Sequence, residues 1–290
     1  MNKTATTVEP EKELLESRSA GEPGAAVPAW SEQRPQVRPV PHHGWLSRLR
    51  SYFFLAPLIW LYTIVLGTIS LFCSLFDRGG RIQHNLAAFW SRLIMKTILS
   101  PVKITGINHL STPAPGSSRA CVYAVTHASA LDIPILYVYL PFQFRIIFKS
   151  ELLSYPFVGW HLKRSGQVCI NQQNPTASIG AVKSALRSLR NGMPLVIFPE
   201  GGRTRDGLLQ PFLPGAFFLA IKAQADIVPI ALVGTFDLLP MNTYHIKCQP
   251  LEMRVGDPIS TQGLTLQDTD KVSTQVKAAI DNLYSLPRST

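Results

Sequence analysis

The chain has 290 residues, of which 46% are hydrophobic and 16% are charged, and its formal net charge is +10. This length allows one sizeable α/β domain with extra segments, but it is short for two full domains. The low charged fraction favours contact with lipid, and the basic excess suits an anionic bilayer surface, a phosphorylated substrate or nucleic acid. The sequence has no zinc-finger spacing, no RNP signature and no basic helix with heptads, so we expect no nucleic-acid partner.

The four cysteines stand alone in apolar or strand-like runs, at Cys73, Cys121, Cys169 and Cys248. No CxxC pair is present to hold a metal or a redox couple, and we expect no metal site. Their setting favours buried structural thiols in a reducing compartment.

Residues 1–45 are rich in Pro, Gly, Ala, Glu and Ser and show no periodicity. Such a segment cannot bury enough apolar area to offset the entropy lost on ordering. We therefore predict a disordered tail over residues 1–45.

The next segment, residues 53–76, contains no charged residue. As a helix it would reach roughly 36 Å, which exceeds the roughly 30 Å hydrocarbon layer of a bilayer. Its length and the polar tail before it argue against a signal peptide. We predict a membrane-inserted helix that starts close to Pro57, because proline is tolerated in a first turn.

After Gly79 and Gly80, the chain has a helical apolar pattern over residues 81–99. This pattern places Ile82, Leu86, Phe89, Trp90, Leu93, Ile94 and Ile98 on one stripe, with His84, Arg92 and Lys96 on the other side. Such a helix lies at a bilayer interface or packs on a soluble domain. We predict both, with residues 46–100 forming a helical hairpin that seats the protein on one leaflet. Because Arg48, Arg50, Arg78 and Arg81 flank both ends of the apolar run, the positive-inside rule does not decide between spanning and one-leaflet insertion.

Residues 101–290 alternate between short apolar runs and helical patterns. The predicted strands cover 101–107, 120–126, 144–150, 167–171, 194–200, 226–234 and 245–259, and the predicted helices cover 129–140, 151–166, 175–192, 214–225 and 268–286. This alternation predicts a layered α/β domain whose mostly parallel sheet is flanked by helices. In such sheets, binding sites form at the carboxyl ends of the strands.

The first candidate for chemistry is the stretch THASALD, in which His127 ends a predicted strand and Asp132 follows. Two residues five positions apart on one helix would not lie on the same face. A turn over Ala128–Leu131 would instead bring the carboxylate back to the imidazole, where it would fix the ring tautomer and leave the other nitrogen as a base. The alternative is a histidine with a structural role.

The second candidate is the stretch FPEGGRT, which follows another predicted strand. Gly201 and Gly202 permit close approach of a ligand to the backbone, and Arg203 offers a forked donor that suits phosphate. The alternative is a solvated turn with a surface arginine.

Together these stretches resemble the PlsC-like glycerophospholipid acyltransferase family, typified by 1-acylglycerol-3-phosphate acyltransferase. THASALD is similar to the first family motif and FPEGGRT to the third. The stretches KSELLSYPFVG (149–159), SGQVCIN (165–171) and VPIA (228–231) are similar to other family segments. The resemblance covers roughly residues 101–260.

The resemblance implies a role for each matching residue. His127 would deprotonate the acceptor hydroxyl, which attacks an acyl thioester, and Asp132 would orient His127. Glu200 and the Gly201–Gly202 backbone would organise the acceptor and the transition state. Arg203 would contact the acceptor phosphate, and Lys149 would add a second positive contact.

Four positions depart from the family pattern. Asn171 and Gln172 stand where the second motif has a basic pair, Gly202 replaces a threonine, and Leu213 replaces a basic residue. Each lost charge-assisted contact would weaken phosphate binding by about ten- to a hundredfold. Either Arg203, Lys149 and Arg164 suffice for the phosphate, or the acceptor is not lysophosphatidate.

The expected function is therefore acyl transfer to a lysophosphatidate-like acceptor in phospholipid biosynthesis. Two other classes stay open, namely a membrane acyl-thioester or lipid hydrolase and a non-catalytic lipid-binding protein. The expected partners are the lipid bilayer, a lysophospholipid acceptor and an acyl donor, either acyl-CoA or acyl carrier protein, with no further cofactor. The expected location is a bacterial inner membrane, with the catalytic domain on its cytoplasmic face.

Overall fold

The computed structural model describes residues 44–77, 79–110, 120–171 and 178–288. The predicted tail, apart from residues 44 and 45, and Gln172 lie outside the described residues. The described part contains one sheet, with strands β1 (Val102–Thr105), β2 (Val122–Val125), β3 (Arg145–Lys149), β4 (Val168–Ile170), β5 (Leu195–Ile197), β6 (Ile227–Val233) and β7 (Leu251–Val255). Each of the seven predicted strands is confirmed, with shorter bounds.

The sheet has the order β1-β7-β6-β2-β5-β3-β4. Only β6 and β7 pair in antiparallel fashion; the other neighbours are parallel. The mostly parallel sheet is therefore confirmed. Strands β2 and β6 are buried along their whole length, as expected for apolar strands that are covered on both faces.

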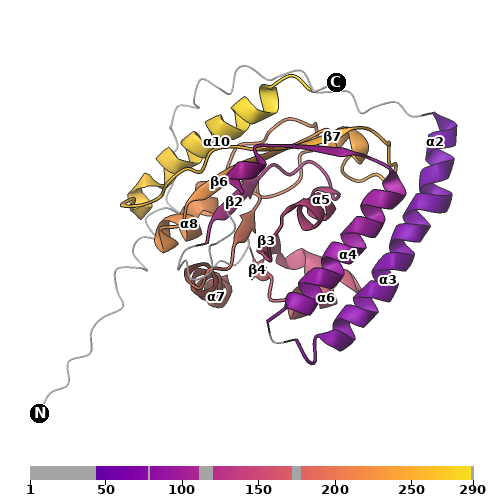
Figure 1. Cartoon of the computed structure of the whole chain (residues 1–290), viewed down its shortest axis with the longest axis horizontal. Helices are drawn as coiled ribbons and strands as arrows, with labels where there is room; N and C mark the ends of the chain where they lie inside the picture. The colour runs from indigo at the N-terminus through magenta and orange to yellow at the C-terminus, as the bar shows by residue number, and fades with distance from the viewer. Residues whose placement is uncertain (1–43, 78, 111–119, 172–177, 289–290) are drawn as a thin grey trace, which may run out of the picture. The chain divides into compact units, whose positions relative to one another are not determined.

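Helices cover both faces of this sheet (Figure 1). The α-helices are α2 (Trp45–Arg50), α3 (Ala56–Cys73), α4 (Arg81–Ile98), α5 (Asp132–Tyr139), α6 (Val158–Arg164), α7 (Ile179–Arg190), α8 (Phe218–Ala223), α9 (Thr235–Leu238) and α10 (Thr269–Ser285). The predicted helix 151–166 was wrong as a single helix. It divides into a 3-10 turn, Ser150–Ser154, and α6, because Pro156 follows an extended Tyr155 and Phe157 has a φ of 62°.

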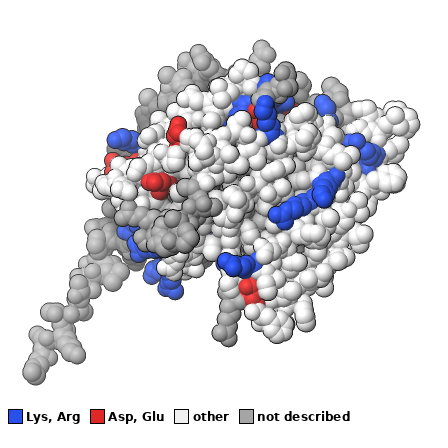
Figure 2. Space-filling model, in the orientation of Figure 1, with Lys and Arg blue, Asp and Glu red and all other residues white. Residues whose placement is uncertain are grey.

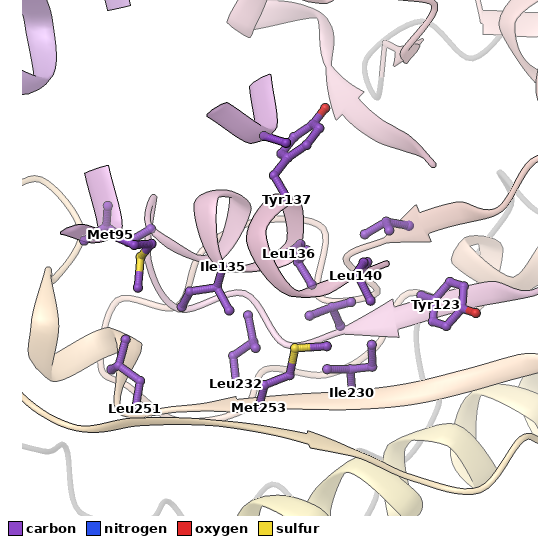
Figure 3. Close-up of a cluster of buried hydrophobic side chains, with 14 of the residues drawn as sticks. Met95, Tyr123, Ile135, Leu136, Tyr137, Leu140, Ile230, Leu232, Leu251 and Met253 are labelled. Carbon is purple, nitrogen blue, oxygen red and sulfur yellow. The ribbon is translucent and has the colours of Figure 1, made fainter. Parts of the chain in front are cut away.

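Two apolar cores flank the sheet. The first lies between the sheet and helices α4 and α5, and the second lies under α7, α8 and α10. Figure 3 shows part of the first core, where Ile135 and Leu136 of α5 lie over Ile230 and Leu232 of β6. This packing fixes α5, and with it the loop that carries the first candidate motif.

The predicted apolar helix is present and longer than expected. It runs without a break from Trp45 to Cys73. Pro57 therefore lies well inside the helix and not in its first turns, and the residues before it, Ser51–Leu55, form a π-helical turn. The proline ring would clash with the carbonyl of Phe53 in a regular α-helix, and the wider turn avoids this clash.

By length and composition alone, this is the one helix in the described part of the chain that could cross a membrane, and 17% of its most apolar window is buried. Its two ends are nevertheless tied to the α/β domain. Ser51 Oγ donates to the Ile246 carbonyl at 3.2 Å, and Ser70 Oγ lies 2.7 Å from His161 Nδ1. Ser51 and Ser70 are nineteen positions apart, which is roughly 28 Å along a helix, so the helix lies along the domain.

Helix α4 packs against α3 and α5, as one arm of a hairpin. The apolar stripe predicted for this helix is buried only in part, and His84, which was predicted on the other side, is buried. Its buried residues are Gln83, His84, Ala87, Ala88, Ser91, Ile94, Met95 and Ile98. Small side chains let α4 approach its neighbours closely, whereas Ile82 and Phe89 of the predicted stripe are 46% and 50% exposed. Two large apolar side chains of this stripe therefore face outward, whereas Ile94 and Ile98 of the same stripe are buried.

The turn of the hairpin is held by one buried cation, Arg145, at the start of β3. Its guanidinium donates to the Gly79 carbonyl at 2.8 Å and also to the Ser165 carbonyl. Gly80 has a φ of 68°, and a Cβ there would lie 2.7 Å from Arg145 Nη1. Gly80 therefore serves both the turn and the close approach of the guanidinium.

We expect Arg145→Ala to lower the free energy of unfolding by about 2–4 kcal/mol, because two carbonyls lose a charged donor in a buried place. Thermal unfolding of the detergent-solubilised protein measures this change, and limited proteolysis next to Gly79 should become faster. Arg81→Ala is the control, since Arg81 is exposed. Equal unfolding temperatures for the two variants would remove Arg145 from this role.

Candidate active site

The candidate residues gather at the carboxyl ends of three neighbouring strands. His127 follows β2 by two residues, Glu200 follows β5 by three, and Lys149 is the last residue of β3. These strands are adjacent in the order β2-β5-β3 and run parallel. The topology therefore brings segments far apart in the sequence to one edge of the sheet, where parallel α/β sheets form their sites.

His127 and Asp132 are joined directly. His127 Nδ1 lies 2.9 Å from Asp132 Oδ2, and the same oxygen accepts the backbone N–H groups of Ala128 at 2.8 Å and Ser129 at 2.9 Å. Helix α5 begins at Asp132, so the loop folds the carboxylate back as expected. The carboxylate is fully buried and the His127 side chain is 17% exposed. An imidazole that donates from Nδ1 presents the lone pair of Nε2 to a reactant.

Ser129 is not poised as a nucleophile. Its hydroxyl donates to the Leu239 carbonyl at 3.0 Å and accepts the Leu131 N–H at 3.2 Å. The side chain is fully buried. These bonds hold the turn between His127 and Asp132, and they leave the hydroxyl without a base.

The loop after β5 makes three contacts with His127, one through a ring and two through hydrogen bonds. The ring of Phe198 stacks on the imidazole with centroids 4.1 Å apart. The carboxylate of Glu200 accepts the His127 N–H at 2.7 Å, and the Thr204 N–H donates to the His127 carbonyl at 3.0 Å. FPEGGRT therefore positions the histidine, a role that its sequence did not suggest.

Glu200 is the most strongly perturbed carboxyl of this site. Its second oxygen, Oε2, accepts the Gln210 N–H at 2.9 Å. Burial raises its pKa to about 7 against the opposing effect of the N–H groups of Gln210 and His127, and the nearby charge of Asp132 raises it further. The carboxyl gains or loses its proton near neutral pH while it holds the backbone of the histidine.

The other predicted site residues lie around the contacts between this loop and His127. Gly201 has a φ of 70°, which favours glycine, and a Cβ at Gly202 would lie 3.5 Å from Lys149 Nζ. Lys149 is therefore a neighbour of the glycine loop. Arg203 is half-buried and has no hydrogen bond or ion pair within the described parts of the chain. Both cations are available to an anion at this edge.

Arg164 is not at this site. It ends α6, next to Ser165, whose carbonyl contacts Arg145 at the amino end of β3. Lys149 lies at the opposite end of the same strand. The expectation that Arg164 adds to phosphate binding is therefore wrong. Asn171 follows β4 at the carboxyl edge, where its N–H donates to Ser178 Oγ at 2.7 Å.

Sequence reasoning missed Phe198, Thr204 and Gln210. Phe198 belongs to an apolar run whose alternation does not show which face meets the histidine. Thr204 and Gln210 act through backbone N–H groups, which any residue type offers. Only the stretch FPEGGRT as a unit carried a signal. Among the described residues, no group of three His, Cys, Asp or Glu side chains could hold a metal ion.

Known proteins are similar to this chain in sequence. The family model described as Acyltransferase matches residues 101–233. The chloroplastic 1-acyl-sn-glycerol-3-phosphate acyltransferase of Arabidopsis thaliana is 33% identical over 227 residues, 77% of this chain and 60% of the relative. The corresponding Brassica napus protein is 30% identical over 229 residues, 77% of this chain and 62% of the relative. The chain thus spans less than two thirds of the length of these relatives.

The fold also has a known counterpart. The crystal structure of the 1-acyl-sn-glycerophosphate acyltransferase PlsC from Thermotoga maritima matches with a TM-score of 0.64. The match covers 84% of this chain and 97% of that chain at 21% identity. This likeness confirms the layered α/β fold with its helical N-terminal segment.

The raised pKa of Glu200 predicts a pH-dependent stability. The folded protein keeps this proton up to about pH 7, whereas an unfolded chain releases it near 4.5. The unfolded state therefore binds fewer protons in this window, and stability falls as the pH rises from about 4.5 to 7. The unfolding temperature of wild type minus that of Glu200→Gln should decrease between pH 5 and 8. The same comparison with Glu151→Gln, an exposed carboxylate, controls for general charge effects; an equal trend there would contradict the assignment.

Proposed function

Because this chain belongs to the PlsC-like glycerophospholipid acyltransferase family, we propose that it transfers a fatty acyl group to a lysophosphatidate-like acceptor. The acyl donor is a thioester and the acceptor group is a free hydroxyl. The observation that carries the proposal is the His127–Asp132 pair, with Nδ1 bound to the carboxylate and the ring partly exposed. The relatives whose printed names are 1-acyl-sn-glycerol-3-phosphate acyltransferases support the substrate class.

The proposed reaction has two steps. His127 Nε2 takes the proton of the acceptor hydroxyl as its oxygen attacks the thioester carbonyl, which gives a tetrahedral intermediate. The carbon–sulfur bond then breaks, and the leaving thiolate takes the proton from His127. The buried Asp132 carboxylate stabilises the imidazolium between these steps. The acceptor is itself the nucleophile, so no acyl-enzyme forms.

The acceptor phosphate is assigned to Arg203 and Lys149. Both lie beside Gly201 and Gly202, whose backbone allows a ligand to approach closely. A guanidinium and an ammonium together suit a phosphate monoester. Asn171 offers no charge at the edge where relatives of the resembled family carry a basic residue, so these two cations carry the recognition.

The protein is proposed to work on one leaflet of a membrane. The large exposed apolar side chains of the long helix include Phe53, Phe54, Trp60, Leu61, Ile64, Val65, Ile69 and Phe72. Figure 2 shows a largely uncharged surface over α3, whereas Lys and Arg side chains lie over α4, where Arg92 and Lys96 are exposed. A crossing helix would carry the attached α/β domain into the bilayer with it, because Ser51 and Ser70 bind that domain. A hairpin seated in one leaflet avoids this cost.

The donor carrier and the membrane are assigned by chemistry and resemblance. A thioester on coenzyme A or on acyl carrier protein would serve the reaction equally, and the chain needs no further cofactor for it. We assign the protein to a bacterial inner membrane, with the sheet on the cytoplasmic side, where both donors occur.

His127→Ala should lower acyl transfer by at least about 100-fold, because the general base is lost. The assay offers labelled acyl-CoA and lysophosphatidate to purified protein and measures the diacyl product by mass spectrometry. His109→Ala is the matched control and should keep most of its turnover, because this histidine lies after β1 and pairs with the exposed Asp257.

Two outcomes of this assay would contradict the proposal. Retained turnover in His127→Ala would remove the base from the mechanism. Release of free acid by the wild-type protein at the same rate without acceptor would instead identify a hydrolase.

Glu200→Gln tests whether the hydrogen bond from the His127 N–H to Glu200 positions the histidine. Its amide nitrogen cannot accept an N–H, so either the bond to His127 or the bond to Gln210 is lost. We expect kcat to fall by about 10- to 100-fold through misplacement of the base, with the acceptor KM nearly unchanged. A higher KM at constant kcat would instead mean that Glu200 contacts the acceptor.

A further inference from the structure

A small pocket lies between α3 and α6, away from the candidate active site. It is lined by Leu71 of α3 and by Trp160, Lys163 and Arg164 of α6. Lys163 and Arg164 are exposed, and neither has an ion pair among the described residues. No acidic side chain lines the pocket. Two cations thus face the same opening without a counter-charge.

The pocket lies at the edge of the sheet opposite to His127. Arg164 is followed by Ser165, whose carbonyl contacts Arg145 at the amino end of β3. The active-site cation Lys149 ends the same strand, about 13 Å further along at the usual rise of a strand. A ligand held by Lys163 and Arg164 is therefore not the acceptor bound beside His127.

The walls of the pocket combine three kinds of group found where lipid meets water. Leu71 belongs to the long apolar helix, and Trp160 is 45% exposed although it is a large aromatic. Tryptophan is enriched at the level of lipid headgroups, and lysine and arginine there attract anionic lipid. The neighbouring Phe72 of α3 is 66% exposed, so the apolar helix surface continues past the pocket.

We propose that this pocket binds the headgroup phosphate of an anionic phospholipid, with the lipid's acyl chains along α3. Lys163 and Arg164 hold the phosphate, while Trp160 and Leu71 contact the glycerol and upper chain region. The inference rests on the proposed seating of the hairpin in one leaflet, but it does not depend on the proposed chemistry. Such a site would fix the amino edge of the sheet at the bilayer surface.

The test measures lipid binding by the full chain in neutral detergent. Labelled phosphatidylglycerol is titrated into the protein, with phosphatidylcholine and inorganic phosphate as competitors. We expect Lys163→Gln/Arg164→Gln to weaken phosphatidylglycerol binding by about 10- to 30-fold, since each cation near the surface contributes about fivefold. Phosphatidylcholine and inorganic phosphate should compete poorly, because the first lacks net charge and the second lacks the chains.

A matched control exists on the other face of the sheet. Lys183 and Arg187 are also one exposed lysine and one exposed arginine on a helix, and α7 belongs to the opposite core. Lys183→Gln/Arg187→Gln should change binding by less than about twofold, because α7 packs on the second core and contributes no residue to the pocket. An equal loss in this control would mean that only net charge matters.

Other results would overturn the proposal in distinct ways. Unchanged phosphatidylglycerol binding by Lys163→Gln/Arg164→Gln would remove the site, and effective competition by inorganic phosphate would make it a simple anion site. The two cations also lie at the carboxyl end of α6, where they can stabilise the helix dipole. A lower unfolding temperature without any loss of lipid binding would assign them that role. Acyl transfer to a lysophosphatidate in the same detergent should be unaffected, so failure of the proposed function would be seen separately.

Discussion

The whole site depends on one oxygen of a buried carboxylate. Asp132 Oδ2 receives the imidazole Nδ1 and two backbone N–H groups, and no described partner binds Oδ1. A fully buried carboxylate is costly unless donors surround it, and here the donors come from the loop that carries His127. The same bonds that stabilise the charge therefore fix the turn, the ring and the tautomer. Loop geometry and base strength cannot be changed independently.

The second motif completes this arrangement from the neighbouring strand. Phe198 covers one face of the imidazole, while Glu200 and Thr204 hold the backbone on either side of the ring. The adjacent Gly202 brings the loop near Lys149 on the next strand. A single loop thus links the position of the base with the position of the cations. The two motifs therefore act as one unit in this fold.

The sequence predicted those parts of the molecule that depend on local pattern. The apolar runs predicted all seven strands, and the His127–Asp132 turn followed from the end of β2 and the start of α5. The burial of α4 could not be predicted in the same way. Ile82 and Phe89 look like core residues in the pattern, but Ala87, Ala88 and Ser91 allow the closer contact between helices and take the inner face. Lipid and core attract the same side chains, so hydrophobicity alone cannot separate them.

Contacts through the backbone were equally hidden from the sequence. Glu200 was expected to face the acceptor because it lies in a motif with glycine and arginine, yet its two oxygens bind the N–H groups of His127 and Gln210. Every residue except proline offers such an N–H, so no pattern marks the partners. The sequence likewise did not show at which edge of the sheet Arg164 lies. It is close in sequence to Asn171 at the carboxyl edge, but β4 lies between them and places the arginine at the amino edge.

The hairpin joins these two edges and so, in the proposed one-leaflet seating, relates the chemistry to the lipid surface. Ser51 binds the Ile246 carbonyl just before β7, whose first residues lie level with the carboxyl end of β6. The turn at Gly79 binds Arg145 at the amino end of β3. The long helix therefore starts at the edge that holds His127 and ends at the edge that holds the α6 pocket. In the proposed one-leaflet seating, a lysolipid along this helix reaches His127 by sliding within the leaflet, without its chain entering water.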